Sequence, residues 1–316
     1  MSSLITALLF TLGGCTDSAA ELLMTCDGGN MDACYRDGNA AANAARPRYS
    51  EARKLYQKAC LPTFRGSGRP EENHPEACHA LAQLVRGAKG GPKDLPRAAE
   101  LFEIACRGGI KDACVDLGIA VYAPPEGSEV REEPERAVEL FFSACNEVDL
   151  TDLPAEGAAP LARACEALGH AYEDGKGVEK GAKDLEKAAE LYQKACDAQY
   201  AAGCVSAGLL MVRSRSKAKI EEAAALFERG CKLDARHGCF DLAKLHEEKA
   251  WSAADDELAA SFYRKSCAID PTRGCYEAAW LMEQGKVTFR EGEIESLYNQ
   301  ACDHGHTAAC TKRNLE

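Results

Sequence analysis

The cysteines of this chain are the residues whose number and spacing could do chemistry. There are 17 in 316 residues, and 16 of them form eight successive pairs along the sequence. Six pairs share a step of eight residues, namely Cys26–Cys34, Cys106–Cys114, Cys196–Cys204, Cys231–Cys239, Cys267–Cys275 and Cys302–Cys310. Two pairs have longer gaps, namely Cys60–Cys78 and Cys145–Cys165. Zinc sites use cysteines two to four residues apart, and that spacing does not occur here, so the pattern favours a disulfide within each pair.

The step of eight residues determines the local geometry of a pair. In a continuous helix such residues would lie about 12 Å apart along the axis, whereas a disulfide needs Cα atoms roughly 4.4–6.8 Å apart. The helix must therefore end after the first cysteine, and the chain must fold back. Small and polar residues between the cysteines, such as Arg107-Gly108-Gly109, suit a turn. Each pair is thus predicted to staple two successive helices.

The pairs recur with the period of a repeat protein. The first cysteines of the last four pairs, at positions 196, 231, 267 and 302, are 35, 36 and 35 residues apart. Before Cys196, the apolar residues Ala188, Leu191, Tyr192 and Ala195 follow the 3.6-residue step of a helix. A period of this length with two helices per unit is typical of a solenoid. The sequence therefore predicts an all-α solenoid of about seven helix pairs over residues 26–316.

Glycine and proline refine the predicted repeat. The segment Glu173–Lys180 contains two glycines and is predicted as a turn between helices. Inserts rich in proline and glycine are predicted as loops at residues 61–75 and 146–160. Glycine or alanine four residues after the second cysteine of a pair would let two helices pack closely. These residues are Gly118, Gly169, Gly208, Ala243 and Ala279.

Charge and cysteine content limit the partners and the compartment. A net charge of −12 argues against nucleic acid or an anionic membrane surface as the main partner. Seventeen cysteines without zinc spacing are too many for a reducing cytosol, so we expect an oxidising compartment.

The N-terminal segment predicts export. Residues 1–14 contain an apolar run that is too short to span a bilayer. Leu12-Gly13-Gly14-Cys15 is similar to the lipobox of bacterial lipoproteins, so residues 1–14 are expected to be a signal and residues 15–25 an N-terminus acylated at Cys15. That lipid would be the only contact with a membrane, in the bacterial periplasm or at the outer membrane. No Lys or Arg precedes the run, unlike in most signal peptides, and a buried N-terminal helix is the alternative.

The repeat resembles a known family. The residues Ala188 to Cys196, followed by Gly203-Cys204, and the turn Tyr172 to Val178 are similar to Sel-one-like repeats, relatives of the tetratricopeptide repeat. The cysteine step is similar to that of the Hcp-type secreted branch. The resemblance implies a right-handed α-solenoid, disulfides joining the second helix of one repeat to the first helix of the next, and a concave groove formed by the first helices. Cysteine-rich relatives also occur in the mitochondrial intermembrane space, which is the alternative compartment.

The resemblance also implies an enzymatic alternative, because some Hcp-type proteins are described as β-lactamases or penicillin-binding hydrolases. Serine β-lactamases combine Ser-x-x-Lys with Ser-Asp-Asn and Lys-Thr-Gly. The chain contains Ser214 to Lys217 and Ser216 to Lys219, without either companion motif. Its seven histidines are scattered, and only His74 and His79, at the first insert, suggest adventitious metal binding. We therefore expect no catalytic residue, cofactor or metal site.

The predicted groove is the preferred functional surface. Residues two and five positions after the cysteine that opens each first helix should point away from the paired helix. The groove candidates are Gln83, Asp116, His170, Ser206, Asp241, Lys244, Glu277 and Trp280. They could also be ordinary exposed helix residues. Three acidic side chains with a tryptophan anchor predict a protein or peptide partner that carries basic residues in an extended segment.

Overall fold

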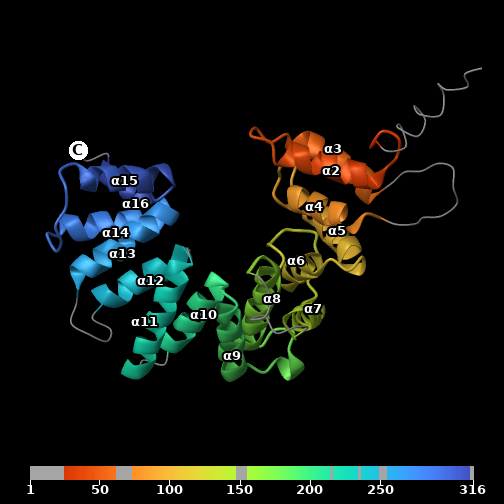
Figure 1. Cartoon of the computed structure of the whole chain (residues 1–316). Helices are drawn as coiled ribbons and strands as arrows, with labels where there is room; N and C mark the ends of the chain where they lie inside the picture. The colour runs from red at the N-terminus through yellow and green to blue at the C-terminus, as the bar shows by residue number, and fades with distance from the viewer. Residues whose placement is uncertain are drawn as a thin grey trace, which may run out of the picture. The chain divides into compact units, whose positions relative to one another are not determined.

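The computed structural model describes residues 25–61, 73–146, 155–213, 216–233, 236–248 and 255–313. Within these ranges the chain forms 15 α-helices, α2 to α16, a short 3₁₀ helix and no strand (Figure 1). It divides into two compact units, residues 1–132 and 133–316. We call the even-numbered helices A helices and the odd-numbered helices B helices. Seven successive A–B pairs followed by α16 agree with the predicted repeat number.

The first unit contains five described helices. They are α2 (Met31–Ala42), α3 (Tyr49–Cys60), α4 (Pro75–Arg86), α5 (Leu95–Arg107) and α6 (Lys111–Tyr122). Helix α2 packs on α3, α3 on α4, α4 on α5, and α5 on α6. This nearest-neighbour packing is the organisation of a solenoid, in which every repeat is stabilised by the adjacent ones.

The second unit continues the same order. Its helices are α7 (Pro134–Asn146), α8 (Ala155–Asp174), the 3₁₀ helix η2 (Glu179–Gly181), α9 (Leu185–Asp197), α10 (Ala201–Val212), α11 (Lys217–Lys232), α12 (Arg236–Glu247), α13 (Asp256–Ile269), α14 (Pro271–Glu283), α15 (Glu293–Asp303) and α16 (Thr307–Arg313). Beyond sequential packing, the A helix α10 contacts both α8 and α12. The A helices α8, α10 and α12 therefore lie side by side.

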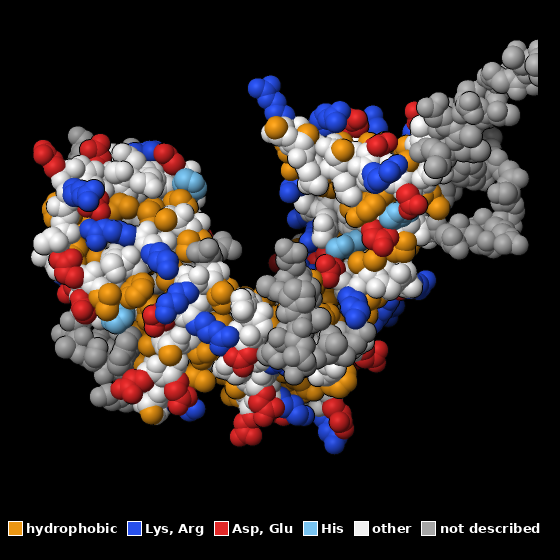
Figure 2. Space-filling model, viewed as in Figure 1, with side chains coloured by type: hydrophobic (Ala, Val, Ile, Leu, Met, Phe, Trp, Pro, Cys, Tyr) orange, Lys and Arg blue, Asp and Glu red, His pale blue; other side chains and the backbone are white. Residues whose placement is uncertain are grey.

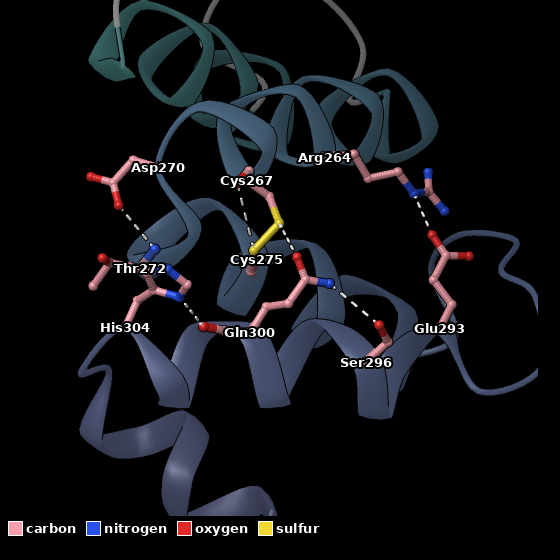
Figure 3. The surroundings of a disulfide bond; sticks show 9 residues. All are labelled: Arg264, Cys267, Asp270, Thr272, Cys275, Glu293, Ser296, Gln300 and His304. Carbon is pink, nitrogen blue, oxygen red and sulfur yellow. Dashed lines mark hydrogen bonds and ion pairs between the residues drawn. A yellow bond between two sulfur atoms is a disulfide. The ribbon is translucent and has the colours of Figure 1, made fainter. Parts of the chain in front are cut away.

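Eight disulfides join the predicted pairs, with Cα–Cα distances between 4.4 and 4.8 Å. Seven of them start at the end of a B helix, and Cys26 lies in the turn before α2. Figure 3 shows one staple, in which Cys267 of α13 is bonded to Cys275 of α14. Gln300 of α15 approaches the same bridge, its Oε1 lying 4.0 Å from Cys267 Sγ. A staple thus lies where three successive helices meet.

In four of the staples, the turn between the two cysteines is a left-handed helix C-terminus. In the Cys106–Cys114 pair, Gly109 has φ of 90°, its N–H donates to Cys106 O at 3.0 Å, and Ile110 N–H donates to Ala105 O at 3.1 Å. The same two bonds follow Cys26, Cys196 and Cys302. This arrangement satisfies the last carbonyls of the B helix and reverses the chain.

One predicted loop is partly wrong. The sequence suggested a loop over residues 146–160, but α8 begins at Ala155 and contains Pro160. The alanines of this segment have high helix propensity, and Ala158 and Leu161 are buried. Helix formation and burial therefore outweigh the proline, and α8 is lengthened at its N-terminus. Most of the other insert lies outside the described residues.

Close packing within A–B pairs depends on small residues, as predicted. Each B helix carries an aromatic ring four residues before its cysteine. In the pairs α8–α9 and α10–α11, this ring packs on a glycine of the preceding A helix, which lies four residues after the cysteine of that helix. An added Cβ at Gly169 would lie 2.6 Å from a ring carbon of Tyr192, and one at Gly208 would lie 2.6 Å from Phe227. Both rings are fully buried, so they cannot simply swing away.

Replacing Gly208 by alanine should therefore lower the free energy of unfolding by about 1–3 kcal/mol, because the Phe227 ring or its helix must shift. Urea denaturation followed by circular dichroism, with the disulfides intact, measures the change. An increase in stability, which a glycine-to-alanine exchange gives on an open helix surface, would contradict the close approach.

Candidate functional site

The predicted groove residue Asp116 is not on the surface. It lies on α6 with 1% of its area exposed. Its Oδ1 accepts a hydrogen bond from Arg86 Nη1 at 2.8 Å, and its Oδ2 lies 3.0 Å from His79 Nε2. Both partners belong to the preceding A helix, α4. The prediction that Asp116 contributes to an acidic groove is therefore wrong, because its charge is balanced inside the fold and ties α6 to α4.

The remaining candidate of the first unit, Gln83, is exposed. Its Nε2 lies 3.1 Å from His79 Nε2, beside the Asp116 cluster. The first unit therefore offers a neutral polar group at this position of its A helices.

His170 lies in a closed polar network between α8, α9 and α10. The Tyr192 hydroxyl donates to Glu173 Oε2 at 2.6 Å, so its oxygen accepts from His170 Nδ1, 2.7 Å away. The other ring nitrogen, Nε2, donates to Glu166 Oε1 at 2.7 Å. Both nitrogens then carry protons, and the hydrogen bond to Glu166, aided by nearby acidic charges, raises the pKa of His170 against the opposing effect of burial.

Ser206 and Arg213 complete this network. Ser206 Oγ donates to Glu166 Oε1 at 3.2 Å, and Arg213 forms an ion pair with Glu173. The predicted groove residues His170 and Ser206 are thus brought together, but their hydrogen-bonding groups are occupied within the fold.

Asp241 on α12 and Glu277 on α14 differ from the acidic residues above. Both side chains are partly buried. No hydrogen bond or ion pair to either carboxylate occurs within the ranges that the structure describes. Burial raises the pKa of Asp241 to about 6, although the charges of Lys244 and Arg273 oppose the shift.

The pKa of Glu277 is also raised, first by burial and then by the charge of Glu247, while the charges of Arg273 and Lys244 oppose the shift. A partly buried carboxylate without a hydrogen bond or ion pair is costly. A cation in direct contact with Asp241 or Glu277 would reduce this cost.

The other two candidates border this pair. Lys244 is exposed, and its Nζ lies 3.5 Å from Glu248 Oε1. Trp280 is partly buried against the core of α13 to α15, and Lys286 Nζ lies 5.1 Å from the centre of its ring. Trp280 therefore presents an aromatic surface that already accepts one cation. We call Asp241, Glu277 and Trp280 the α12–α14 patch.

Sequence reasoning missed a set of structural glutamates eight residues after an opening cysteine. Tyr192, Tyr263 and Tyr298 donate their hydroxyls to the glutamate of their own repeat. The acceptors are Glu173, Glu247 and Glu283, at 2.6, 2.8 and 2.8 Å. Where the ring is Phe227, the equivalent position is Val212. A buried hydroxyl requires an acceptor, so the joint occurrence of Tyr and Glu was a usable signal.

Other predicted sites are not brought together or are not described. Within the described ranges, no group of three His, Cys, Asp or Glu residues could hold a metal ion. None of the described helices is both long enough and apolar enough to cross a bilayer. Cys15, Ser214 and Arg215 lie outside the described residues. Figure 2 shows acidic and basic side chains interspersed on the face drawn.

Comparison with known proteins identifies the repeats. The family model described as Sel1 repeat matches residues 32–61, 75–110, 111–149, 162–200 and 237–270. Cytochrome c oxidase assembly factor 7 of Mus musculus is 29% identical over 143 residues, which cover 45% of this chain and 56% of that protein. The chain therefore spans about half the length of this curated relative.

Two solved structures share the fold. A Sel1 repeat protein from Oxalobacter formigenes has a TM-score of 0.63 and 19% identity, covering 85% of this chain and 99% of that one. A protective antigen of uropathogenic Escherichia coli that displays an SLR fold has a TM-score of 0.59 and 17% identity, covering 93% of this chain and 58% of that one. At these identities the likeness is one of fold alone.

The raised pKa of Asp241 predicts a pH-dependent effect on stability. The folded protein takes up this proton near pH 6, whereas an unfolded chain does so near pH 3.9, about the ordinary value. The folded state therefore binds more protons between these values, and the contribution of Asp241 to stability is lost as the pH rises through 6. Asp241→Asn should unfold at higher urea than the wild type at about pH 8 but not at about pH 3.5.

The exposed Glu190 on α9 provides a control, and Glu190→Gln should change stability little at either pH. If Asp241→Asn raised the stability against urea equally at both pH values, or did not raise it at the higher pH, the proposed cost of burying the Asp241 carboxylate would be contradicted.

Proposed function

The chain belongs to the Sel1 repeat family, and on that premise we propose that it is a non-enzymatic scaffold that binds an extended protein or peptide segment on the A helices of its second unit. The observation that carries this proposal is the pair of partly buried, unpartnered carboxylates Asp241 and Glu277. Other acidic groups on the same helices, such as Glu166 and Glu247, are engaged within the fold. A partner's cation would supply the direct ion pair that Asp241 and Glu277 do not form with the nearby Lys244 or Arg273.

The chemistry of the patch selects the occupant. Two carboxylates on adjacent A helices fit the ammonium of a lysine or the guanidinium of an arginine. Trp280 offers an aromatic surface beside them for an apolar or cationic side chain. We therefore propose an extended segment that combines Arg or Lys with apolar residues, and no nucleic acid, as the partner.

The disulfides restrict where this scaffold works. Eight bridges require an oxidising compartment. One candidate is the bacterial periplasm, with a lipid on Cys15. The other candidate is the mitochondrial intermembrane space, which the similarity to cytochrome c oxidase assembly factor 7 supports. A role in assembling another protein would use the same docking surface. Mass spectrometry of the native N-terminus distinguishes the two compartments, because only the first predicts acylation of Cys15.

The double variant Asp241→Lys/Glu277→Lys tests the docking surface. A fluorescent peptide of alternating Arg and Leu should bind the wild type and lose at least tenfold in affinity to this variant, because charge-assisted hydrogen bonds contribute about 1.5–3 kcal/mol each. Fluorescence anisotropy over a range of salt concentrations measures both the affinity and its salt dependence, which should become weaker.

Glu190→Lys/Glu221→Lys is the matched control. It makes the same change in net charge on two exposed positions of the B helices α9 and α11, and should leave binding nearly unchanged. Equal affinity of the patch variant and the wild type, or equal binding of a peptide with Glu in place of Arg, would rule out the proposed surface.

A further inference from the structure

The eight staples differ in how far solvent reaches them. In six pairs both cysteines are buried, and in Cys302–Cys310 the first cysteine is buried. Cys106 and Cys114 are both partly exposed. Among the described disulfides, this is the one in which neither cysteine is buried, so we expect an external thiol to reach it most readily. The difference does not concern peptide docking, because the pair lies in the first unit.

The turn across this pair carries little side-chain cover. Gly108 and Gly109 occupy the two central positions, although the same Gly-Gly step follows the buried Cys26, so the turn alone does not set the exposure. A Cβ at Gly109 would have no atom within 4 Å, so the turn is open on that side, whereas a Cβ at Gly108 would lie 2.4 Å from Pro75 Cγ. By comparison, the Cys196–Cys204 turn carries Gln199 and Tyr200, and both of its cysteines are 0% exposed.

The surroundings favour one direction of attack by a thiolate. Arg107 is exposed beside the turn, but its charge is paired with Glu103, 2.8 Å away, so the preference comes from the helix ends. Cys106 is the second-last residue of α5, whereas Cys114 lies in the first turn of α6. A helix N-terminus stabilises a thiolate, and a helix C-terminus does not. Cys114 is therefore the better leaving group.

Helix α6 has other attachments that would hold it when the staple opens. Asp116 binds Arg86 and His79 of α4 from within the core. Val115 and Leu117, on either side of Asp116, are also buried. Opening of the bridge thus leaves α6 docked, so that the two thiols stay close enough to be oxidised again.

From these observations we infer that Cys106–Cys114 is a thiol–disulfide exchange site whose substrate is a dithiol of another molecule. One thiolate of the dithiol attacks Cys106 Sγ, forms a mixed disulfide and expels Cys114 as a thiolate, which takes up a proton. The second thiol of the dithiol then attacks the first sulfur of the same molecule, which is bonded to Cys106 Sγ. This forms the disulfide of the departing molecule and releases Cys106, which takes up a proton. Two electrons and two protons pass to the protein, and the dithiol leaves as a disulfide.

Stepwise reduction of the native protein tests this inference. Dithiothreitol is added without denaturant, the reaction is stopped with acid, and free thiols are alkylated and mapped by mass spectrometry. Cys106 and Cys114 should become labelled together, at least tenfold faster than any other cysteine, with no loss of helical circular dichroism during this phase. Earlier labelling of another pair, simultaneous labelling of all pairs, or loss of helix at the same rate would overturn the inference.

Variants separate the site from general reducibility. Cys106→Ser/Cys114→Ser should remove the fast phase and leave the slower ones, whereas Cys196→Ser/Cys204→Ser, in a buried staple, should retain it. With glutathione as a monothiol, the mixed disulfide should form on Cys106, and Cys114 should be the alkylated residue. The reverse assignment, or a fast phase that persists in the first variant, would contradict the site.

Discussion

A bridge between cysteines eight residues apart leaves room for little except a helix end, a reversing turn and a helix start. The observed Cα–Cα distances of 4.4–4.8 Å show that each pair is held near the lower end of the range that disulfides allow. In four pairs with this step, a left-handed residue three positions after the first cysteine and two backbone hydrogen bonds make the reversal, whereas after Cys267 the extended Asp270 does so. Because a disulfide recurs between successive repeats, the fold is set locally and repeated.

Because the core side chains are small, the disulfides are important for the stability of the fold. Much of the core consists of alanine, with one buried aromatic ring in each B helix. Alanine buries little apolar area, so each repeat gains less from the hydrophobic effect than a repeat rich in leucine would. A staple restricts the unfolded chain and contributes about 2–4 kcal/mol where its loop is unstrained. Glycine beneath the rings, as at Gly169 and Gly208, lets the helices approach closely and recovers dispersion energy.

The sequence was sufficient for features that depend on neighbours along the chain. Cysteine spacing, helical periodicity and small residues predicted the pairs, the helix order and the close packing, because each follows from a few consecutive residues. Features that depend on other helices were not predicted. Asp116 fitted the groove pattern, but Arg86, 30 residues earlier, binds it within the core. The α8 extension was hidden by Pro160, whose effect on the helix is outweighed by burial of its neighbours.

The same distinction separates structural from functional polar groups. In three repeats the tyrosine hydroxyl explains one glutamate of the A helix, whereas Tyr56 donates to Asn39. The His170 network explains a second acidic residue in its repeat. Asp241 and Glu277 remain without such an explanation inside the fold. Their positions follow from the repeat, but their lack of partners could be recognised only once the neighbouring helices were in place. Binding is therefore assigned to the polar groups that folding does not use.

Peptide mapping of the native, unreduced protein tests the central claim most directly. Proteolysis between the cysteines followed by mass spectrometry should recover eight pairs of linked peptides. Counting from Cys26, each pair should join one cysteine to the next cysteine in the sequence, from Cys26–Cys34 to Cys302–Cys310. Free thiols among these sixteen residues, or bridges between non-adjacent repeats, would contradict the stapled architecture and the oxidising compartment inferred from it.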